Sequence, residues 1–301
     1  MIVGVSKYTA GWPSLESIPS ELENLEVVLK SQGFKVEKYI DPDSVKLKSI
    51  FENFIDKFGY DKNNRLLFYY SGHGHTRIAG TKGYLVPADA PVPRNDERGF
   101  LRKALPMSQI LEWSRRLEAK HALFLFDSCF FGTIFATKEM PKSPPHISRA
   151  TELPVRQFIT AGDAGETVPS KSVFTPVFID ALKYKWGDLN KDGYISGTEL
   201  GLYLQSKVPE HTNQTPQYGK IQDYELARGD FIFILEKTKK RNSNKQGTLL
   251  IESRPSGGKV LIDGSYQGKT PVEVKGLLSG RKSIVIRMQG YNEWSECKNK
   301  G

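Results

Sequence analysis

The sequence predicts an α/β fold with a mostly parallel sheet flanked by helices on both faces, followed by a small all-β domain. Strand and helix patterns alternate along residues 1–235, as they do where helices connect parallel strands. A charged stretch without periodicity, residues 236–246, then ends the alternation. Beyond it, short apolar runs separated by Gly and Pro turns occupy residues 247–301 without a helical pattern.

The elements of the first domain follow from these patterns in order. Short apolar runs bounded by turn residues predict strands at 1–6, 34–40, 65–71, 121–126, 155–160 and 230–235. Apolar residues with a helical period predict helices at 20–32, 43–58, 107–119, 174–186 and 198–208. Ser20 is a candidate N-cap of the first helix, and Gly33 is a natural stop for it. In the second domain, strands are expected at 247–253, 258–264, 270–274 and 282–288.

The composition is that of a globular protein. Hydrophobic residues make up 38% and charged residues 26% of the chain, and no apolar run approaches the ~20 residues of a spanning helix. The net charge of +9 raises the alternative of a nucleic-acid partner. The basic residues are scattered, however, apart from 236–245, which lacks aromatic residues and favours a solvated linker. We therefore expect neither a membrane span nor a nucleic-acid partner, although a basic stripe on one face would revive the latter.

Two apolar strands end in chemically useful residues. The run at 65–71 leads into Gly72-His73-Gly74, and the run at 121–126 leads into Asp127-Ser128-Cys129. If the two strands are parallel neighbours, His73 and Cys129 emerge at the same edge of the sheet. A nearby imidazole can take the proton of a thiol and later give it to a leaving amine. A buried structural cysteine is the alternative, but the paired placement favours a catalytic dyad over it.

These residues bear a resemblance to a known family. The segments YYSGHG and FLFDSC strongly resemble the histidine and cysteine motifs of caspase-like cysteine peptidases, nearer to bacterial and metacaspase-type members than to animal caspases. GVSKY, GYLVPADA, FITAG and QTPQYG support the resemblance, which covers nearly all of residues 1–235. The animal-type pentapeptide around the cysteine is absent, so cleavage after aspartate is not implied.

The resemblance implies roles for particular residues. Cys129 would be the nucleophile and His73 the general base and acid, with the backbone N–H groups of Gly74 and Cys129 as the oxyanion hole. Metacaspase-type enzymes prefer Arg or Lys before the scissile bond and bind it with acidic residues, here Asp127 and Glu21. The family usually has Asp at the position of Glu21, so this pocket differs in shape. The expected partner is therefore a protein or peptide with a basic residue before the cleavage site.

Residues 188–199, DLNKDGYISGTE, fit the twelve-residue calcium loop of an EF-hand. The side chains of Asp188, Asn190 and Asp192 occupy its first, third and fifth positions. Tyr194 would offer its carbonyl, Ser196 would act directly or through water, and Glu199 would close the loop. Calcium is thus the expected cofactor, with a metal-free polar turn as the alternative. Whether calcium would regulate an enzyme or only fix the local fold is left open.

The last part of the chain resembles a PEGA domain, a small β module of bacterial multidomain proteins. The resemblance depends on the order of PSG, DG, GKTP, GLLSGRKSI and GY. It implies a binding or anchoring role toward a protein or envelope partner.

The Pro-rich basic stretch after Cys129 offers Lys142 and Arg149 as self-cleavage sites. The compartment is left open: cytoplasmic if the first residue is native, extracytoplasmic if a leader was removed. The rival function is a non-catalytic, calcium-dependent binding protein on a degenerate peptidase fold.

Overall fold

The computed structural model describes residues 1–77, 82–129, 151–162, 171–235, 246–278 and 280–300. Contacts divide the chain into two compact units. The first unit comprises Met1–Leu182 and Gly187–Leu235, and the second comprises Lys183–Trp186 and Glu236–Gly301. Among the described residues, no helix has both the length and the apolarity to cross a membrane.

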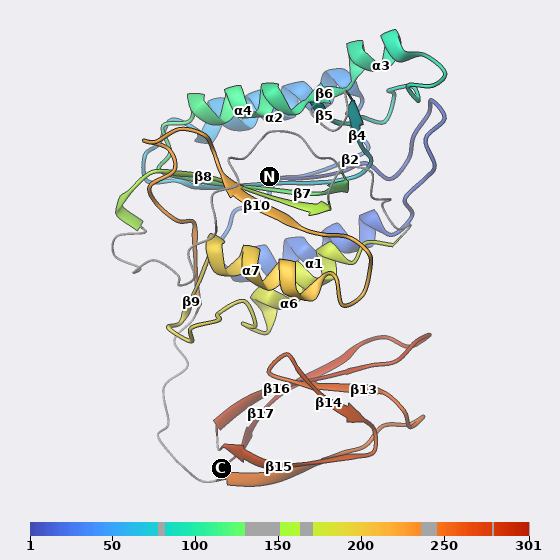
Figure 1. Ribbon diagram of the computed structural model, residues 1–301, viewed down its shortest axis with the longest axis vertical. Helices are drawn as coiled ribbons and strands as arrows, with labels where there is room; N and C mark the ends of the chain where they lie inside the picture. Colours follow the sequence, from blue (N-terminus) through green and yellow to red (C-terminus); the bar gives the residue numbers. More distant parts are fainter. Residues whose placement is uncertain (78–81, 130–150, 163–170, 236–245, 279, 301) are drawn as a thin grey trace. The chain divides into compact units, whose positions relative to one another are not determined.

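A six-stranded sheet forms the centre of the first unit (Figure 1). Its strands run in the order β10-β8-β7-β3-β1-β2. Their bounds are β1 Ile2–Gly4, β2 Lys38–Ile40, β3 Arg65–Ser71, β7 His121–Cys129, β8 Val155–Gly162 and β10 Gln217–Lys220. All neighbouring pairs are parallel except β10 with β8, which is antiparallel. The predicted mostly parallel sheet is therefore confirmed.

Helices cover both faces of this sheet, as predicted (Figure 1). One face carries α1 (Ile18–Ser31), α6 (Phe174–Lys183) and α7 (Gly197–Lys207). The other carries α2 (Ser44–Phe58) and α4 (Met107–Arg116). The apolar faces of α2 and α4 pack in one core with β1, β3 and β7, because their buried residues recur with the helical period.

The start of the first helix differs from its prediction. Helix α1 begins at Ile18 after Ser17, with Pro19 in its first turn, where proline's missing N–H costs no hydrogen bond. Ser20 is consequently inside the helix and not its N-cap, and its hydroxyl donates to the Ser17 carbonyl (2.9 Å). Helix α2 does begin with a side-chain cap, because Asp43 accepts a hydrogen bond from the Lys46 N–H (2.8 Å).

Several strands lie outside the central sheet. The predicted last strand, residues 230–235, is β11 (Ile232–Ile234), which pairs with β9 (Tyr194–Ser196) in a separate two-stranded sheet. An apolar run indicates a buried strand but does not show with which strand it pairs. Here the partner, β9, lies within the polar loop after α6. Beside the central sheet, β4 (Gly74–Arg77), β5 (Lys82–Leu85) and β6 (Leu105–Pro106) form a three-stranded sheet. The short helix α3 (Glu97–Lys103) was not predicted either.

The second unit is antiparallel throughout its described strands, which confirms the all-β prediction. One sheet pairs β12 (Gln246–Ile251) with β15 (Val272–Leu278). The other has the order β14-β13-β16-β17, with bounds Ser265–Lys269, Lys259–Ile262, Gly280–Arg287 and Trp294–Lys300. Both sheets contribute to one small core of buried aliphatic residues, which are Ile251, Val260, Ile262 and Ile284. Strands β14 and β17 were not predicted.

Candidate active site

Strands β3 and β7 bring the two predicted catalytic positions to one edge of the sheet. They are parallel neighbours with Ser71 opposite Asp127. The pairing continues past β3, because the Gly72 N–H donates to the Asp127 carbonyl (3.3 Å). Strand β7 ends at Cys129, which pairs with Gly162 of β8 after an irregularity in the ladder. The described part of Cys129 is its backbone, and that backbone lies at the carboxyl ends of the parallel strands.

The imidazole of His73 has a defined hydrogen-bond partner. Its Nε2 lies 2.8 Å from the carbonyl oxygen of Pro13. A carbonyl oxygen can only accept, so Nε2 carries the proton and Nδ1 of the neutral ring keeps its lone pair. Burial lowers the pKa of His73 below its ordinary value, and the bond to Pro13 opposes this. A neutral His73 with a free lone pair on Nδ1 can act as a base.

The residue after His73 presents a backbone N–H at the same edge. The Val86 N–H donates to the His73 carbonyl (3.1 Å), and Gly74 faces Leu85 in the β4–β5 ladder. Hydrogen-bonded and non-hydrogen-bonded pairs alternate in an antiparallel ladder. The pair of Gly74 and Leu85 is thus the non-hydrogen-bonded kind, whose N–H groups point away from the partner strand. This leaves the Gly74 N–H directed away from β5.

Asp127 is a buried carboxylate surrounded by hydroxyl groups. Its side chain is 3% exposed, and Oδ2 accepts short hydrogen bonds from Ser172 and Thr175 (2.5 Å each). Tyr69 and Ser71 donate more distantly, at 3.4 Å. Burial raises the pKa of Asp127, while the hydroxyl donors, led by Ser172, lower it. The hydroxyl groups therefore offset part of the cost of burying a negative charge.

Glu21 brings a second carboxylate to this place. It lies in the first turn of α1, is 8% exposed, and neither carboxylate oxygen has a well-formed hydrogen bond among the described residues. The pKa of Glu21 is raised to about 7, mainly by burial and then by the negative charge of Asp127. The Ser17 side chain and the Ser172 N–H oppose this rise. Sequence reasoning named both acidic residues, and the structure brings them together. A cation bound between these two buried carboxylates would reduce the electrostatic repulsion between them.

Replacing Glu21 by glutamine is expected to change how stability depends on pH. The pKa of Glu21 is raised to about 7 in the fold, from about 4.3 in an unfolded chain. The contribution of Glu21 to the free energy of unfolding is therefore fully present below its pKa in the unfolded chain. It is lost as the pH rises through its pKa in the folded protein. The Glu21→Gln variant should melt at a higher temperature than wild type at pH 8 and show a flatter dependence between pH 5 and 8. Thermal unfolding across that range measures both.

The matched control is Glu23→Gln, which removes an exposed glutamate from the same helix. Its melting temperature should follow that of wild type across the range. A Glu21→Gln variant with the wild-type pH slope would show that Glu21 ionises freely in the fold.

The predicted calcium loop has its side-chain oxygens turned onto its own backbone. The Asp192 N–H donates to Asp188 and Asn190 (3.1 and 2.9 Å), and the Gly193 N–H donates to Asp188 (3.0 Å). Gly193 has a φ of 92°, which glycine adopts without strain. The Tyr194 N–H donates to Asp192 (2.9 Å). The oxygens of the first, third and fifth positions are therefore drawn toward the same short stretch of backbone.

Glu199 closes the loop from the first turn of α7. It forms a capping box with Ser196, whose N–H donates to Oε2 (2.9 Å) and whose hydroxyl accepts from the Glu199 N–H (3.1 Å). Its Oε1 accepts from the Asn190 N–H (3.3 Å). Oxygen ligands of this kind are those calcium prefers. Within the described ranges, no three His, Cys, Asp or Glu side chains are gathered as a metal cluster.

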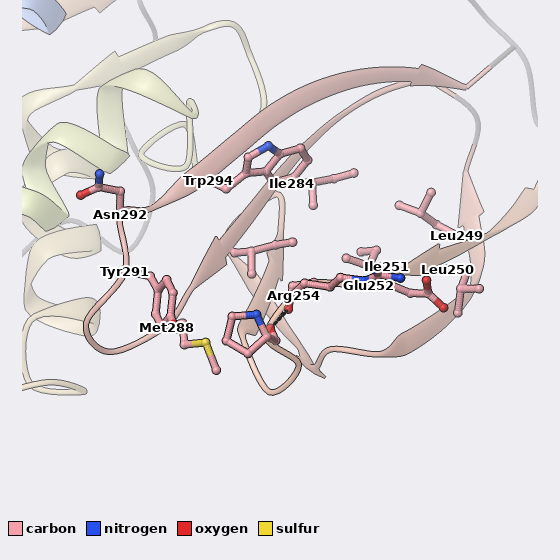
Figure 2. A pocket seen from close by; sticks show the side chains of 13 residues that line it. Leu249, Leu250, Ile251, Glu252, Arg254, Ile284, Met288, Tyr291, Asn292 and Trp294 are labelled. Carbon is pink, nitrogen blue, oxygen red and sulfur yellow. Dashed lines mark hydrogen bonds between the residues drawn. The ribbon is translucent and has the colours of Figure 1, made fainter.

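The second unit contains an apolar groove of about 450 Å³ (Figure 2). It follows β12 and β16 and the turns beyond them, and its apolar lining includes Leu249, Ile251, Ile284, Ile286, Met288 and Trp294. Two further features set it apart from a closed core: Leu250 is 62% exposed and Trp294 is 45% exposed. Strand β12, in the described sheets, pairs along one edge only, with β15. The groove is therefore an accessible apolar surface beside an edge strand.

Sequence reasoning missed the groups that hold the predicted site residues in place. Pro13 acts through its carbonyl oxygen, which has no sequence signature. Ser172 and Thr175 lie far along the chain from Asp127, and only the packing of α6 against the sheet reveals them. Lys142 and Arg149, the predicted self-cleavage sites, lie outside the described residues.

A caspase-like α/β unit, with a histidine and a cysteine at the ends of neighbouring parallel strands, is the class that this fold and this site define. A family model described as the caspase domain (peptidase C14) matches residues 1–247. The chain therefore belongs to the caspase-domain family of cysteine peptidases. A second model, the PEGA domain, matches residues 246–297. A search of curated proteins found no match.

Proposed function

We propose that the protein is a cysteine endopeptidase that uses His73 and Cys129 and cleaves after Arg or Lys. The observation that carries the specificity is the pair of buried carboxylates, Glu21 and Asp127, beside the predicted nucleophile. Asp127 precedes Cys129 by two residues on β7, so a basic side chain bound to its carboxylate would lie next to the scissile bond. A guanidinium or ammonium group entering there would neutralise charges that are costly to bury alone.

The described groups support a standard sequence of proton transfers. Nδ1 of His73 accepts the thiol proton of Cys129, and the thiolate attacks the scissile carbonyl. The resulting oxyanion accepts hydrogen bonds from the N–H groups of Gly74 and Cys129. The imidazolium then gives its proton to the leaving amine, and an acyl-enzyme remains. Water, deprotonated by His73, hydrolyses the thioester and restores the thiol.

Fluorogenic peptides with Arg, Lys or Asp before the scissile bond test this proposal directly. Turnover of the Arg and Lys peptides alone is the expected result, and equal turnover of the Asp peptide would contradict the specificity. We further propose that the enzyme cleaves itself at Lys142 or Arg149, and mass spectrometry of the chain after prolonged incubation tests this. An intact segment in an active preparation would remove that part of the proposal.

The loop at 188–199 is proposed to bind calcium. Its support is the set of oxygen donors at the required spacing, and calcium bound to the folded loop should stabilise the fold. We expect millimolar calcium to raise the melting temperature of the wild type and to leave that of Asp188→Asn nearly unchanged. Magnesium at the same concentration is the control, because it prefers a smaller, octahedral site. An equal rise in the wild type and Asp188→Asn would place the ion elsewhere.

The second unit is proposed to bind an extended protein segment in its apolar groove. The unpaired edge of β12 can accept an added strand, and residues 247–301 carry nine Lys and Arg against five Asp and Glu, which favours acidic flanks on the partner. Phage-displayed peptides selected on the full chain should alternate apolar residues and lose binding to Leu250→Asp. The control is Tyr266→Asp, which changes an exposed residue outside the groove lining. Selected peptides that bind Leu250→Asp as well as wild type would contradict the assignment.

A further inference from the structure

We propose that Tyr8 and Trp12 form an aromatic clamp that fixes the ring of His73 and keeps water from it, and so acts as a positioning device for catalysis. The inference rests on the proposed role of His73 as the base. Neither aromatic residue gives or takes a proton in the proposed mechanism. Their effect would pass through the imidazole.

Two aromatic rings contact the imidazole. The Trp12 ring lies 5.1 Å from that of His73, centre to centre, at an interplanar angle of 31°. The Tyr8 ring lies 4.8 Å away at 50°. Aromatic contacts at such separations favour particular ring orientations. The ring of His73 is thus constrained by its two neighbours as well as by the bond from Nε2 to the Pro13 carbonyl.

The same segment also holds the backbone of His73. The Tyr8 hydroxyl accepts a hydrogen bond from the His73 N–H (2.7 Å), and the His73 carbonyl accepts from the Tyr70 hydroxyl (3.1 Å). Residues 8–13 therefore supply two aromatic rings, those of Tyr8 and Trp12, a hydroxyl acceptor and the Pro13 carbonyl. One short loop after β1 thus holds the N–H group and the ring of His73, while Tyr70 of β3 holds its carbonyl.

That loop is itself anchored on both sides of Tyr8. The N–H groups of Ser6 and Lys7 donate to Oδ1 of Asp41 (2.6 and 3.0 Å). The Thr9 N–H donates to the Ala88 carbonyl (2.8 Å). These long-range bonds fix the backbone from which the clamp projects. Without them, two aromatic side chains on a surface loop would not hold a catalytic ring in one orientation.

Trp12 has two opposing effects on the pKa of His73. Removing water from an imidazole disfavours its charged form, whereas an indole face attracts a cation and favours it. Burial is the leading cause of the lowered pKa of His73, so we expect the exclusion of water to outweigh the attraction of the indole face for a cation. The titratable neighbours do not reverse this. Tyr8 stays neutral, because burial raises its pKa. The ring of His75 lies 6.2 Å from that of Trp12, centre to centre, and burial lowers the pKa of His75.

The test is an NMR titration of the His73 ring in the full chain, with its signal assigned by its loss in His73→Gln. In Trp12→Ala, we expect the pKa of His73 to rise toward its ordinary value and the acid limb of kcat/KM to move up by the same amount. At neutral pH, kcat/KM should fall about ten- to a hundredfold, because a misplaced catalytic group costs that much. Trp12→Phe should restore most of both properties. Tyr224→Ala, which removes an exposed aromatic side chain of the first unit outside every proposed site, should change neither.

The possible outcomes separate the clamp from the proposed function. A raised pKa of His73 in Trp12→Ala, in a protein without hydrolytic activity, would support the clamp and contradict the catalytic role. An unchanged or lowered pKa in a folded Trp12→Ala variant would overturn the clamp, whatever the activity. If Trp12→Ala does not fold, Trp12→Phe and Tyr8→Phe decide. Tyr8→Phe keeps the ring and loses the acceptor of the His73 N–H, so an unchanged kcat in that variant would also count against the clamp.

Discussion

Replacing Cys129 by alanine is expected to abolish hydrolysis of Arg and Lys peptides, with kcat falling by on the order of 10⁴-fold or more. The reason is that covalent catalysis has no substitute once the nucleophile is removed, and the remaining groups only bind and polarise the substrate. His73→Gln should cost nearly as much. The double variant should be no worse than either single one, because base and nucleophile act as a unit. Initial rates at saturating peptide measure all three.

Cys297→Ala is the matched control, since it removes the other cysteine of the chain. It should keep the kcat of the wild type. The reverse pattern, with Cys129→Ala active and Cys297→Ala inactive, would move the nucleophile to the second unit. Equal residual rates in all variants would show that the activity does not come from this chain.

The sequence predicted the edge of the sheet where the site lies, and the reason is physical. Parallel strands buried on both faces are continuous apolar runs, so an abrupt change to polar residues marks a strand end. His73 and Cys129 follow two such runs, and the register of Ser71 with Asp127 puts those ends side by side. Glu21 was found by family resemblance alone. Its place in the first turn of α1, facing the end of β7, follows from tertiary packing.

What the sequence could not predict depends on partners distant in the chain. The apolar run at 230–235 was predicted to be a strand of the first domain. The structure pairs β11 with β9, which lies within the predicted calcium loop, in a separate sheet. An apolar run predicts that a strand is buried, but it does not predict with which strand it pairs. The role of Pro13 could not be predicted either, because its backbone carbonyl, and not its side chain, orients the His73 ring. Hydrogen bonds to backbone groups are common in proteins, and they are largely invisible to residue patterns.

Asp127→Asn is expected to lower kcat/KM for the Arg peptide by about 10²- to 10³-fold. Losing one partner of a buried, hydrogen-bonded charge pair costs about 2–5 kcal/mol. Asparagine matches aspartate in size, and the hydroxyls of Ser172 and Thr175 can rotate to serve its amide. The fold should therefore survive while the charge is lost. The loss should be smaller in Glu21→Gln, because Asp127 remains to meet the guanidinium.

A peptide with citrulline in place of Arg separates charge recognition from any general damage to the site. Citrulline keeps the shape of the side chain and removes its charge, so the wild type should hydrolyse it poorly and Asp127→Asn should do no worse. The difference between the two peptides, taken across the two enzymes, gives the coupling between Asp127 and the substrate charge. An equal loss with both peptides would mean that Asp127 supports the strand of Cys129 and does not read the substrate. A loss confined to the Arg peptide would assign to Asp127 the preference for a basic residue.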